Sequence, residues 1–351
     1  MTTNRKTILE SAPLGPRWPC LDPFLFCAHH DDTYPASNGK MGVQAVELEG
    51  REMGSDFSAK DGFSMYHGEP IPGFPGHPHR GFETVTLVRK GRIDHADSLG
   101  AAARFGGGDV QWLTAGKGIQ HSEMFPLLNS DKPNPLELFQ IWLNLPAKNK
   151  MVEPHFTMFW NEQIPRVTFS DAAGKKTKVT VVAGGLEGVD KTLPPPPESW
   201  ASEAGSDVAI WTLELEPGAR WTMPKAAGAE THRMLYFFMG KSLSVDGEAV
   251  KQHLAMHIDA QSDVELVNTG DDVVELVLLQ GKPIGETVSQ YGPFVMNTQE
   301  EIMQAMQDYR RTQFGGWPWK DNDPVHGAEN RRFARYPGAA EDDLPPVVAT
   351  A

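Results

Sequence analysis

The stretch GFPGHPHRGFETVT, at residues 73–86, decides how this sequence is interpreted. It places His77 and His79 two residues apart, and the later stretch HSE places His121 and Glu123 at the same spacing. Residues two apart in a β-strand project from the same face, so each pair offers two side chains next to each other if its segment is a strand. Glycines before each pair allow the tight turns and close backbone approach that strand ends converging on one site require.

Three imidazoles and one carboxylate suit a first-row transition metal and leave positions open for water, dioxygen or substrate. The pattern therefore favours a catalytic metal site over a closed structural one. The alternative reading is that Pro78 marks a plain loop with exposed histidines, because proline is poorly tolerated in central strands. Nitrogen and oxygen ligands of this kind do not discriminate between Fe, Ni, Mn, Cu and Zn.

Size and charge restrict the remaining possibilities. A chain of 351 residues is long enough for about two domains. Its net charge of -14 opposes direct binding to nucleic acid or to an anionic membrane. Two cysteines are too few for a disulfide framework, and no apolar run approaches the ~20 residues that span a bilayer. We expect a cytoplasmic protein that binds neither nucleic acid nor membrane directly.

Short β-rich runs separated by Gly, Pro, Asn and Asp predict an all-β sandwich or barrel. The clearest strands of the first half are residues 83–88, 109–113 and 136–145. A second β-rich block, residues 211–279, has a similar order of elements and predicts a diverged internal duplication. This block has no His-x-His or His-x-Glu pair, so one metal site per chain is expected. A capping box at residues 298–301 predicts a helix that Gly315 and Gly316 close.

Three motifs, residues 73–86, 108–124 and 292–298, closely resemble those of the pirin family. The resemblance extends from about Leu21 to Phe314. It implies a bicupin, with two antiparallel β-barrel (jelly-roll) domains, a C-terminal helix and tail, and iron in the amino-terminal barrel only. The expected division is an extension at 1–20, a metal-binding cupin at 21–150, a Pro-rich inter-domain segment at 151–207, a metal-free cupin-like domain at 208–297, and a helix and tail at 298–351.

The resemblance also implies that the metal ligands are His77, His79, His121 and Glu123. The general cupin pattern expects its glutamate four residues after the second histidine, a place that Glu83 occupies. Both carboxylates could approach the ion, and we favour Glu123 because it shares a strand face with His121. Glu83 is then expected behind the ligands, or in a salt bridge with Arg80.

The family implies two functions. One is dioxygenase chemistry on flavonols such as quercetin, with Fe(II) as the expected cofactor, dioxygen as co-substrate and Glu123 as a general base. The expected substrate pocket consists of Phe74, Trp112, Met124 and Gln140, although each of them could instead pack the core. The other function is an iron-dependent, redox-sensing co-regulator with a protein partner. A cupin enzyme with a different substrate is a third possibility.

Overall fold

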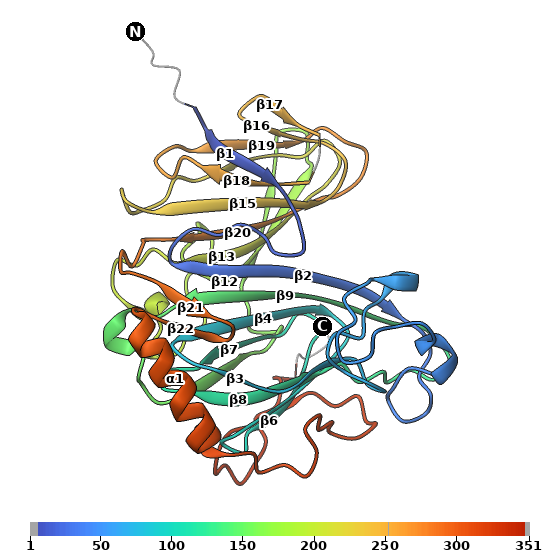
Figure 1. Cartoon of the computed structure of the whole chain (residues 1–351). Helices are drawn as coiled ribbons and strands as arrows, with labels where there is room; N and C mark the ends of the chain where they lie inside the picture. Colours follow the sequence, from blue (N-terminus) through green and yellow to red (C-terminus); the bar gives the residue numbers. More distant parts are fainter. Residues whose placement is uncertain (1–5, 252, 348–351) are drawn as a thin grey trace. The chain divides into compact units, whose positions relative to one another are not determined.

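The computed structural model of the chain describes residues 6–251 and 253–347. Within these residues the regular structure is almost entirely β-strand, with one longer α-helix near the end of the chain (Figure 1). The described residues form two compact units. The amino-terminal unit comprises residues 29–140, 147–162 and 286–347, and the carboxy-terminal unit comprises residues 6–28, 141–146, 163–251 and 253–285.

Two five-stranded antiparallel sheets carry the amino-terminal unit. The first has the order β10-β7-β4-β9-β2, with strands His155–Phe159, Val110–Thr114, Phe82–Lys90, Asn134–Asn144 and Phe24–Tyr34. The second has the order β23-β6-β5-β8-β3, with strands Phe333–Arg335, Ala102–Phe105, Ile93–Asp97, Ile119–Met124 and Gly73–His79. The ranges of β2 and β9 each include a boundary between the two units.

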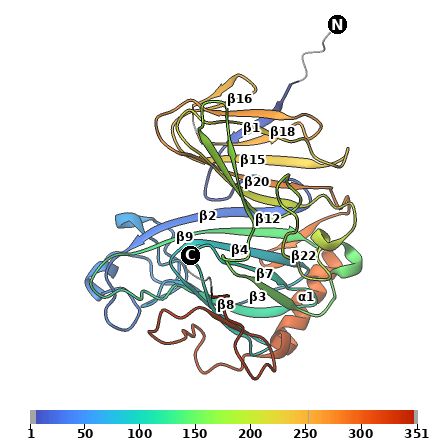
Figure 2. The same cartoon turned by 180° about the vertical axis from the view of Figure 1, so that it is seen from behind.

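The carboxy-terminal unit contains a seven-stranded and a four-stranded sheet, visible from behind in Figure 2. The larger sheet has the order β1-β18-β15-β20-β13-β12-β11, with strands Ile8–Pro13, Leu254–Ile258, His232–Met239, Val274–Gly281, Ala209–Leu215, Lys176–Ala183 and Arg166–Ser170. The smaller has the order β14-β19-β16-β17, with strands Arg220–Met223, Val264–Asn268, Leu243–Val245 and Glu248–Val250.

Each unit packs a hydrophobic core between its two sheets. In the amino-terminal unit, Val88 and Leu113 of one sheet join Phe105 and Ile119 of the other. In the carboxy-terminal unit the corresponding core is larger and includes residues from six strands of the larger sheet. The sheets have edges and do not close into barrels, so each unit is a jelly-roll-like sandwich. The predicted all-β class with two cupin-type domains is confirmed.

Strand order supports the predicted duplication. The run β7-β4-β9-β2 matches β18-β15-β20-β13, and β6-β5-β8-β3 matches β17-β16-β19-β14, counting strands in chain order in each half. By this match β3 corresponds to β14, β8 to β19 and β9 to β20. The two units therefore repeat one strand arrangement with different side chains.

The predicted helix is confirmed as α1, Gln299–Thr312. Thr298 accepts a hydrogen bond from the Glu301 amide, and the Glu301 side chain accepts one from the Thr298 amide, so the capping box forms. Two short strands of the amino-terminal unit, β21 and β22, Ser289–Tyr291 and Phe294–Met296, precede α1. Short 3-10 helices occupy Ala45–Leu48, Lys60–Gly62, Ala147–Asn149, Trp200–Ser202 and Gln313–Gly315.

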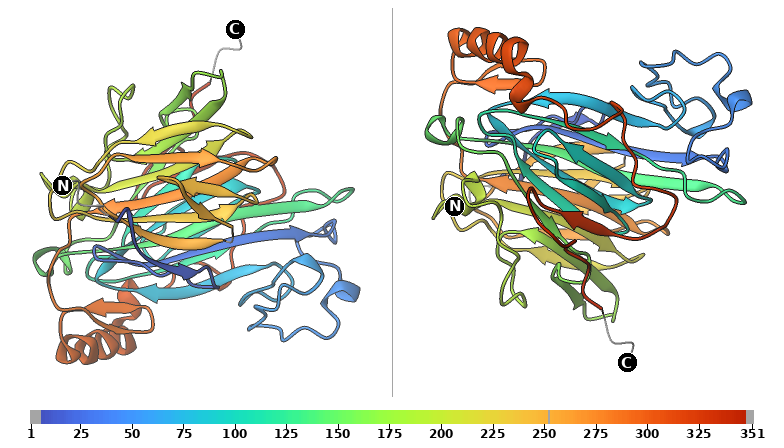
Figure 3. Two further views of the ribbon diagram at one scale, coloured as in Figure 1. Left: turned by 90° about the horizontal axis from the view of Figure 1, so that it is seen from above. Right: turned by 90° about the horizontal axis from the view of Figure 1, so that it is seen from below.

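The segment after α1 is anchored to the amino-terminal unit. Its strand β23 pairs with β6, and the segment runs along that side of the unit in the right-hand view of Figure 3. Arg104 donates hydrogen bonds to the carbonyls of Gly327 and Glu329. The ranges expected as an extension and a connector, 1–20 and 151–207, also contribute strands to these sheets, and the domain boundaries stay a prediction. None of the described helices is long and apolar enough to cross a bilayer.

Candidate metal centre

Three histidines meet between the two sheets of the amino-terminal unit. His77 and His79 come from β3 and His121 from the neighbouring β8, where His121 lies opposite His77. Their ligand atoms all lie within 4.8 Å of one another. The two-residue spacing puts both β3 imidazoles on one face, and the register shift between Phe74 and His77 resets the alternation so that Phe74 lies on that face too. Pro78 is thus part of a strand at the sheet edge, and the loop alternative is wrong.

Burial keeps these imidazoles neutral. Removal from water lowers the pKa of His77 to about 4 and lowers the pKa values of His79 and His121 well below the ordinary value. The Nδ1 of His77 donates a hydrogen bond to the Pro75 carbonyl at 2.8 Å, which leaves the lone pair of Nε2 available. Neutral imidazole with an oriented free nitrogen is the form that binds metal ions.

His121 provides a direct test of whether a metal fits. Its side chain is fully buried, and neither ring nitrogen has a hydrogen-bond partner among the described residues. A buried polar atom without a partner is costly, and a bound ion removes that cost at one nitrogen. The donor set and this unsatisfied ring fit a transition metal of the first row.

Glu123 lies beside the histidines and is held by two donors. Its Oε2 is 3.9 Å from His121 Nε2. Thr86 Oγ1 donates to Oε1 at 3.1 Å, and Gln140 Nε2 donates to Oε2 at 2.9 Å. Burial raises the pKa of Glu123, and the His95, Thr86 and Gln140 neighbours oppose that rise. The carboxylate is therefore oriented toward the histidines and binds a proton more readily than an exposed glutamate does.

Glu83, the alternative carboxylate, faces the other way. Thr86 reaches Glu123, so the even-numbered residues of β4 face the site and Glu83 lies on the opposite face. There Glu83 accepts a hydrogen bond from Thr114 Oγ1 at 2.6 Å. Arg80, the expected salt-bridge partner of Glu83, instead pairs with Asp308 at 2.9 Å. Strand parity thus explains why Glu123 and not Glu83 accompanies the histidines.

The structure brings two of the four expected pocket residues to the site. Gln140 contacts Glu123, and the Phe74 ring lies 6.3 Å from the His77 ring between centroids. Trp112 alternates with the core residue Leu113 on β7 and therefore points to the far side of its sheet. Met124 alternates with Glu123 on β8 and points away in the same manner. Both are fully buried packing residues.

A fourth buried histidine was missed by the sequence reasoning. His95 lies opposite Glu123 across β5 and β8, and its ring is 5.5 Å from that of His121. Its Nε2 bonds Asp97 Oδ2 at 3.2 Å, whereas its Nδ1 has no partner among the described residues. The signal was present, because His95 and Asp97 have the same two-residue spacing as the metal-binding pairs.

Two further polar side chains face the same space. Thr84 and Gln111 share strand faces with Thr86 and the core residue Leu113, respectively. The Thr84 hydroxyl and both amide atoms of Gln111 are buried without a hydrogen-bond partner among the described residues. Unsatisfied buried groups around three histidines indicate room for water or a polar ligand.

Comparison with known families gives two matches along the chain. The family model described as "Pirin" matches residues 11–143, and the model described as "Pirin C-terminal cupin domain" matches residues 210–315. The first range contains the three histidines and Glu123, and the second contains about half of the carboxy-terminal unit together with α1.

Curated relatives of the chain include proteins named as pirins and as quercetin dioxygenases. A Pseudomonas aeruginosa protein named "Putative quercetin 2,3-dioxygenase" is 35% identical over 238 residues, 68% of this chain and 78% of the relative. Human "Pirin" is 33% identical over 257 residues, 72% of this chain and 81% of the relative. Among solved structures, a quercetin 2,3-dioxygenase from Acinetobacter baumannii has a TM-score of 0.63 at 23% identity, covering 88% of this chain and 96% of its own.

Proposed function

Because the chain belongs to the pirin family, we propose that it is a metal-dependent dioxygenase of the quercetin 2,3-dioxygenase type. The observation that carries the proposal is the group of three buried neutral imidazoles beside an oriented carboxylate. The name of the Pseudomonas relative supports the choice of a flavonol as substrate. The reaction would open the flavonol ring with dioxygen and release one ring carbon as carbon monoxide.

His77, His79, His121 and Glu123 are the proposed ligands, and Fe(II) is the proposed cofactor. Ni, Mn, Cu and Zn accept the same donor set, so the experiment below tests the protein loaded with each of them as well. The metal, when bound, supplies a Lewis acid that lowers the pKa of a hydroxyl group brought to it. Burial of all three imidazoles keeps competing protons off the ligand nitrogens near neutral pH.

Glu123 is the proposed general base for the 3-hydroxyl of the flavonol. Burial raises its pKa, which favours acceptance of a proton when the carboxylate has moved off the metal. Gln140 Nε2 donates to Glu123 Oε2, and the one Thr86 hydroxyl hydrogen faces both Glu123 Oε1 at 3.1 Å and Gln140 Oε1 at 2.7 Å, so this group of side chains orients the carboxylate. The proton moves from the hydroxyl oxygen to a carboxylate oxygen of Glu123.

An aromatic cluster beside His77 supports a flat substrate. The Phe74 ring lies 5.1 Å from Tyr66 and 6.1 Å from Phe125 between centroids. Tyr66 is fixed from behind, because its hydroxyl donates to Asp32 Oδ2 and accepts from His30 Nδ1, both at 2.7 Å. Packed rings of this kind exclude water and offer faces for a planar ring system.

Turnover of quercetin by separately metal-loaded samples tests the proposal. We expect oxygen-dependent loss of quercetin absorbance, with carbon monoxide released in equal amount, for at least one metal. Glu123→Gln keeps the size of the side chain but removes the base, and is expected to lower kcat by about 100-fold or more. His257→Ala, a change in the carboxy-terminal unit, is the matched control and should leave turnover unchanged.

Absence of carbon monoxide with all five metals would exclude the dioxygenase proposal for this substrate. A protein partner and a cytoplasmic location stay predictions. A redox-sensing role would instead show as a partner captured by the ferrous but not the ferric protein, without turnover.

A further inference from the structure

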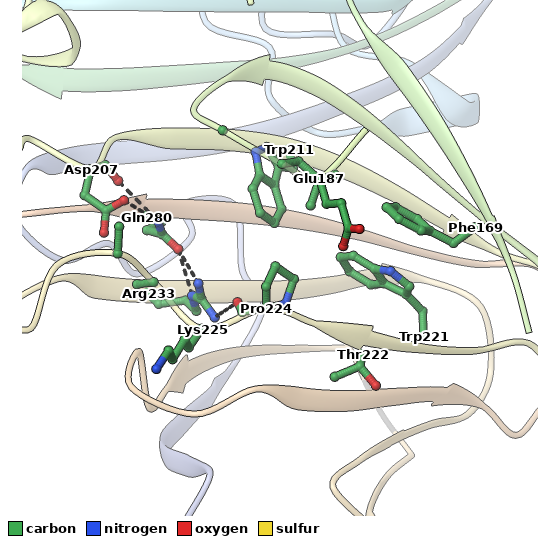
Figure 4. Close-up of a pocket in the computed structure, with 14 residues that line it drawn as sticks. Phe169, Glu187, Asp207, Trp211, Trp221, Thr222, Pro224, Lys225, Arg233 and Gln280 are labelled. Carbon is green, nitrogen blue, oxygen red and sulfur yellow. Dashed lines mark hydrogen bonds between the residues drawn. The ribbon is translucent and has the colours of Figure 1, made fainter. Parts of the chain in front are cut away.

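A partly open cavity of about 370 Å³ lies in the carboxy-terminal unit and is lined by residues of that unit (Figure 4). Its walls come from both sheets of this unit, with Trp211, Arg233 and Gln280 from the larger sheet and Trp221 from the smaller. The volume is in the range of small-molecule sites. It is therefore large enough for a compact organic ligand.

A buried guanidinium forms part of the cavity wall. Arg233 shares its strand face with the core residues Leu235 and Phe237, so it points between the sheets, and it is 1% exposed. Its Nε and Nη2 donate to Gln280 Oε1 at 2.8 and 2.6 Å, and its Nη1 donates to the Pro224 carbonyl at 2.8 Å. Both acceptors are neutral.

This leaves hydrogen-bonding capacity and charge at Arg233. A guanidinium carries five N–H groups, and three of them are used, so two have no partner among the described residues. No carboxylate of the described residues forms an ion pair with it within 4.0 Å. A buried cation in this state is costly, and an anion placed in the cavity would remove that cost.

The neighbouring acidic groups act on the charge of Arg233 without forming an ion pair with it. Asp207 accepts from the Gly228 amide, from Thr231 Oγ1 and from Gln280 Nε2, and these donors hold its oxygens away from Arg233. Glu187 lies at an exposed position of the lining, where water solvates its charge. Burial lowers the pKa of Arg233 to about 10, and nearby Asp207, Asp259 and Asp263 oppose that change, so the group remains a cation at neutral pH.

The opposite side of the cavity is aromatic. Trp211 and Trp221 are 2% and 7% exposed, and Phe169 packs on Trp221 with 5.3 Å between ring centroids. Figure 4 shows these rings on one side of the space and Arg233 with Gln280 on the other. Indole faces stack on flat rings, whereas a guanidinium fork matches a carboxylate.

We propose that this cavity binds a small planar carboxylate, with the carboxylate on the two remaining N–H groups of Arg233 and the ring of the ligand against Trp211 and Trp221. The site needs no metal. Its existence does not depend on the dioxygenase proposal.

Calorimetric titration of the full chain with benzoate, and with neutral benzamide as the matched ligand, tests the proposal. We expect benzoate to bind at least 10-fold more tightly than benzamide. Ala227→Trp places a bulky ring at an exposed position of the cavity lining and should abolish benzoate binding without disturbing the core. Arg233→Lys keeps the charge but removes the fork, and should weaken binding by 10-fold or more.

Two controls separate this site from others. Arg220→Gln, an exposed arginine one residue from Trp221 that pairs with Glu265, should leave the affinity unchanged. His121→Ala should also leave it unchanged, whereas loss of binding there would assign benzoate to the histidine site. Equal binding of benzoate and benzamide, no binding at all, or full binding by Ala227→Trp would overturn the proposal, whether or not the Arg233 variant folds.

Discussion

The strand pair β3 and β8 of the amino-terminal unit presents His77 and His121 to the space between the sheets, whereas the corresponding pair β14 and β19 presents Trp221 and Leu266. Trp221 lies opposite Leu266 just as His77 lies opposite His121. At this strand pair, two copies of one scaffold therefore hold polar, unsatisfied side chains in one case and apolar side chains in the other. The backbone arrangement does not determine the chemistry, since alternation only decides which residues face inward.

The two units have a glutamine at equivalent strand positions, and its side-chain amide takes part in both the histidine site and the Arg233 cavity. The sequence LELFQ ends at Gln140 on β9, and LVLLQ ends at Gln280 on the corresponding β20. Gln140 donates from its nitrogen to the Glu123 carboxylate, whereas Gln280 accepts at its oxygen from the Arg233 guanidinium. An amide carries both a donor and an acceptor, so it can orient an anion in one unit and a cation in the other.

The largest expected difference between the two units is in metal binding, and replacement of His121 should remove most of it. His121→Ala removes one of the proposed four protein ligands, so metal affinity should fall by more than the about 10- to 100-fold that loss of a supporting residue costs. Elemental analysis after dialysis measures the retained metal. His253→Ala, at an exposed position of the carboxy-terminal unit, should retain it all. Equal metal in both variants would contradict the ligand assignment.

Truncation of Leu266 tests the apolar counterpart. Leu266 is fully buried in the core of the carboxy-terminal unit, so Leu266→Ala should lower the free energy of unfolding by about 2–5 kcal/mol. The midpoint of urea unfolding, followed by circular dichroism, measures this change. Thr222→Ala, at an exposed position of β14, should shift the midpoint little. Metal content should stay the same in both variants.

The two glutamines give a paired and smaller effect. Gln140→Leu removes a donor from Glu123 and should weaken metal binding by about 10-fold, because the carboxylate loses its orientation and its pKa rises further. Gln280→Leu should leave metal binding intact but lower stability by about 1–3 kcal/mol, since Arg233 loses its acceptor. Metal titration and urea unfolding of both variants measure the two effects. If Gln280→Leu weakened metal binding and Gln140→Leu did not, the roles assigned to the two amides would be wrong.

A difference between the two equivalent segments LELFQ and LVLLQ predicts that the stability of the amino-terminal unit depends on pH. Glu137 lies where LVLLQ has Val277. Burial alone would raise the pKa of Glu137, but hydrogen bonds from His29 and Lys90 and the charges of Arg89 and Lys90 lower it to about 2. The unfolded chain then binds more protons than the folded chain between about pH 4.5 and 2. This stabilisation is full above about pH 4.5 and is lost as the pH falls through about 2.

We expect this acid-sensitive stabilisation to amount to about 1–2 kcal/mol, because Lys90 is half exposed and water screens the pair. Urea unfolding of wild-type protein and of Glu137→Gln between pH 6 and 3 measures it. The two curves should converge as the pH falls. A constant difference across this range would show that Glu137 does not titrate in this way.

The sequence by itself determined the β class, the capped helix and three of the metal-centre residues. These follow from local rules, since strand alternation, the capping box and the i,i+2 spacing within each pair, His77 with His79 and His121 with Glu123, need no distant contact. The same spacing at His95 and Asp97 carried a signal that the reasoning did not use.

Only the tertiary structure decided which buried residues face the site. Glu83, Trp112 and Met124 lie next to site residues in sequence, yet strand register turns them to the opposite faces of their sheets. The Arg233 cavity was also invisible in the sequence, because its walls come from strands far apart in the chain. Alternation fixes relative direction within a strand, but only packing of the two sheets selects which face becomes the interior.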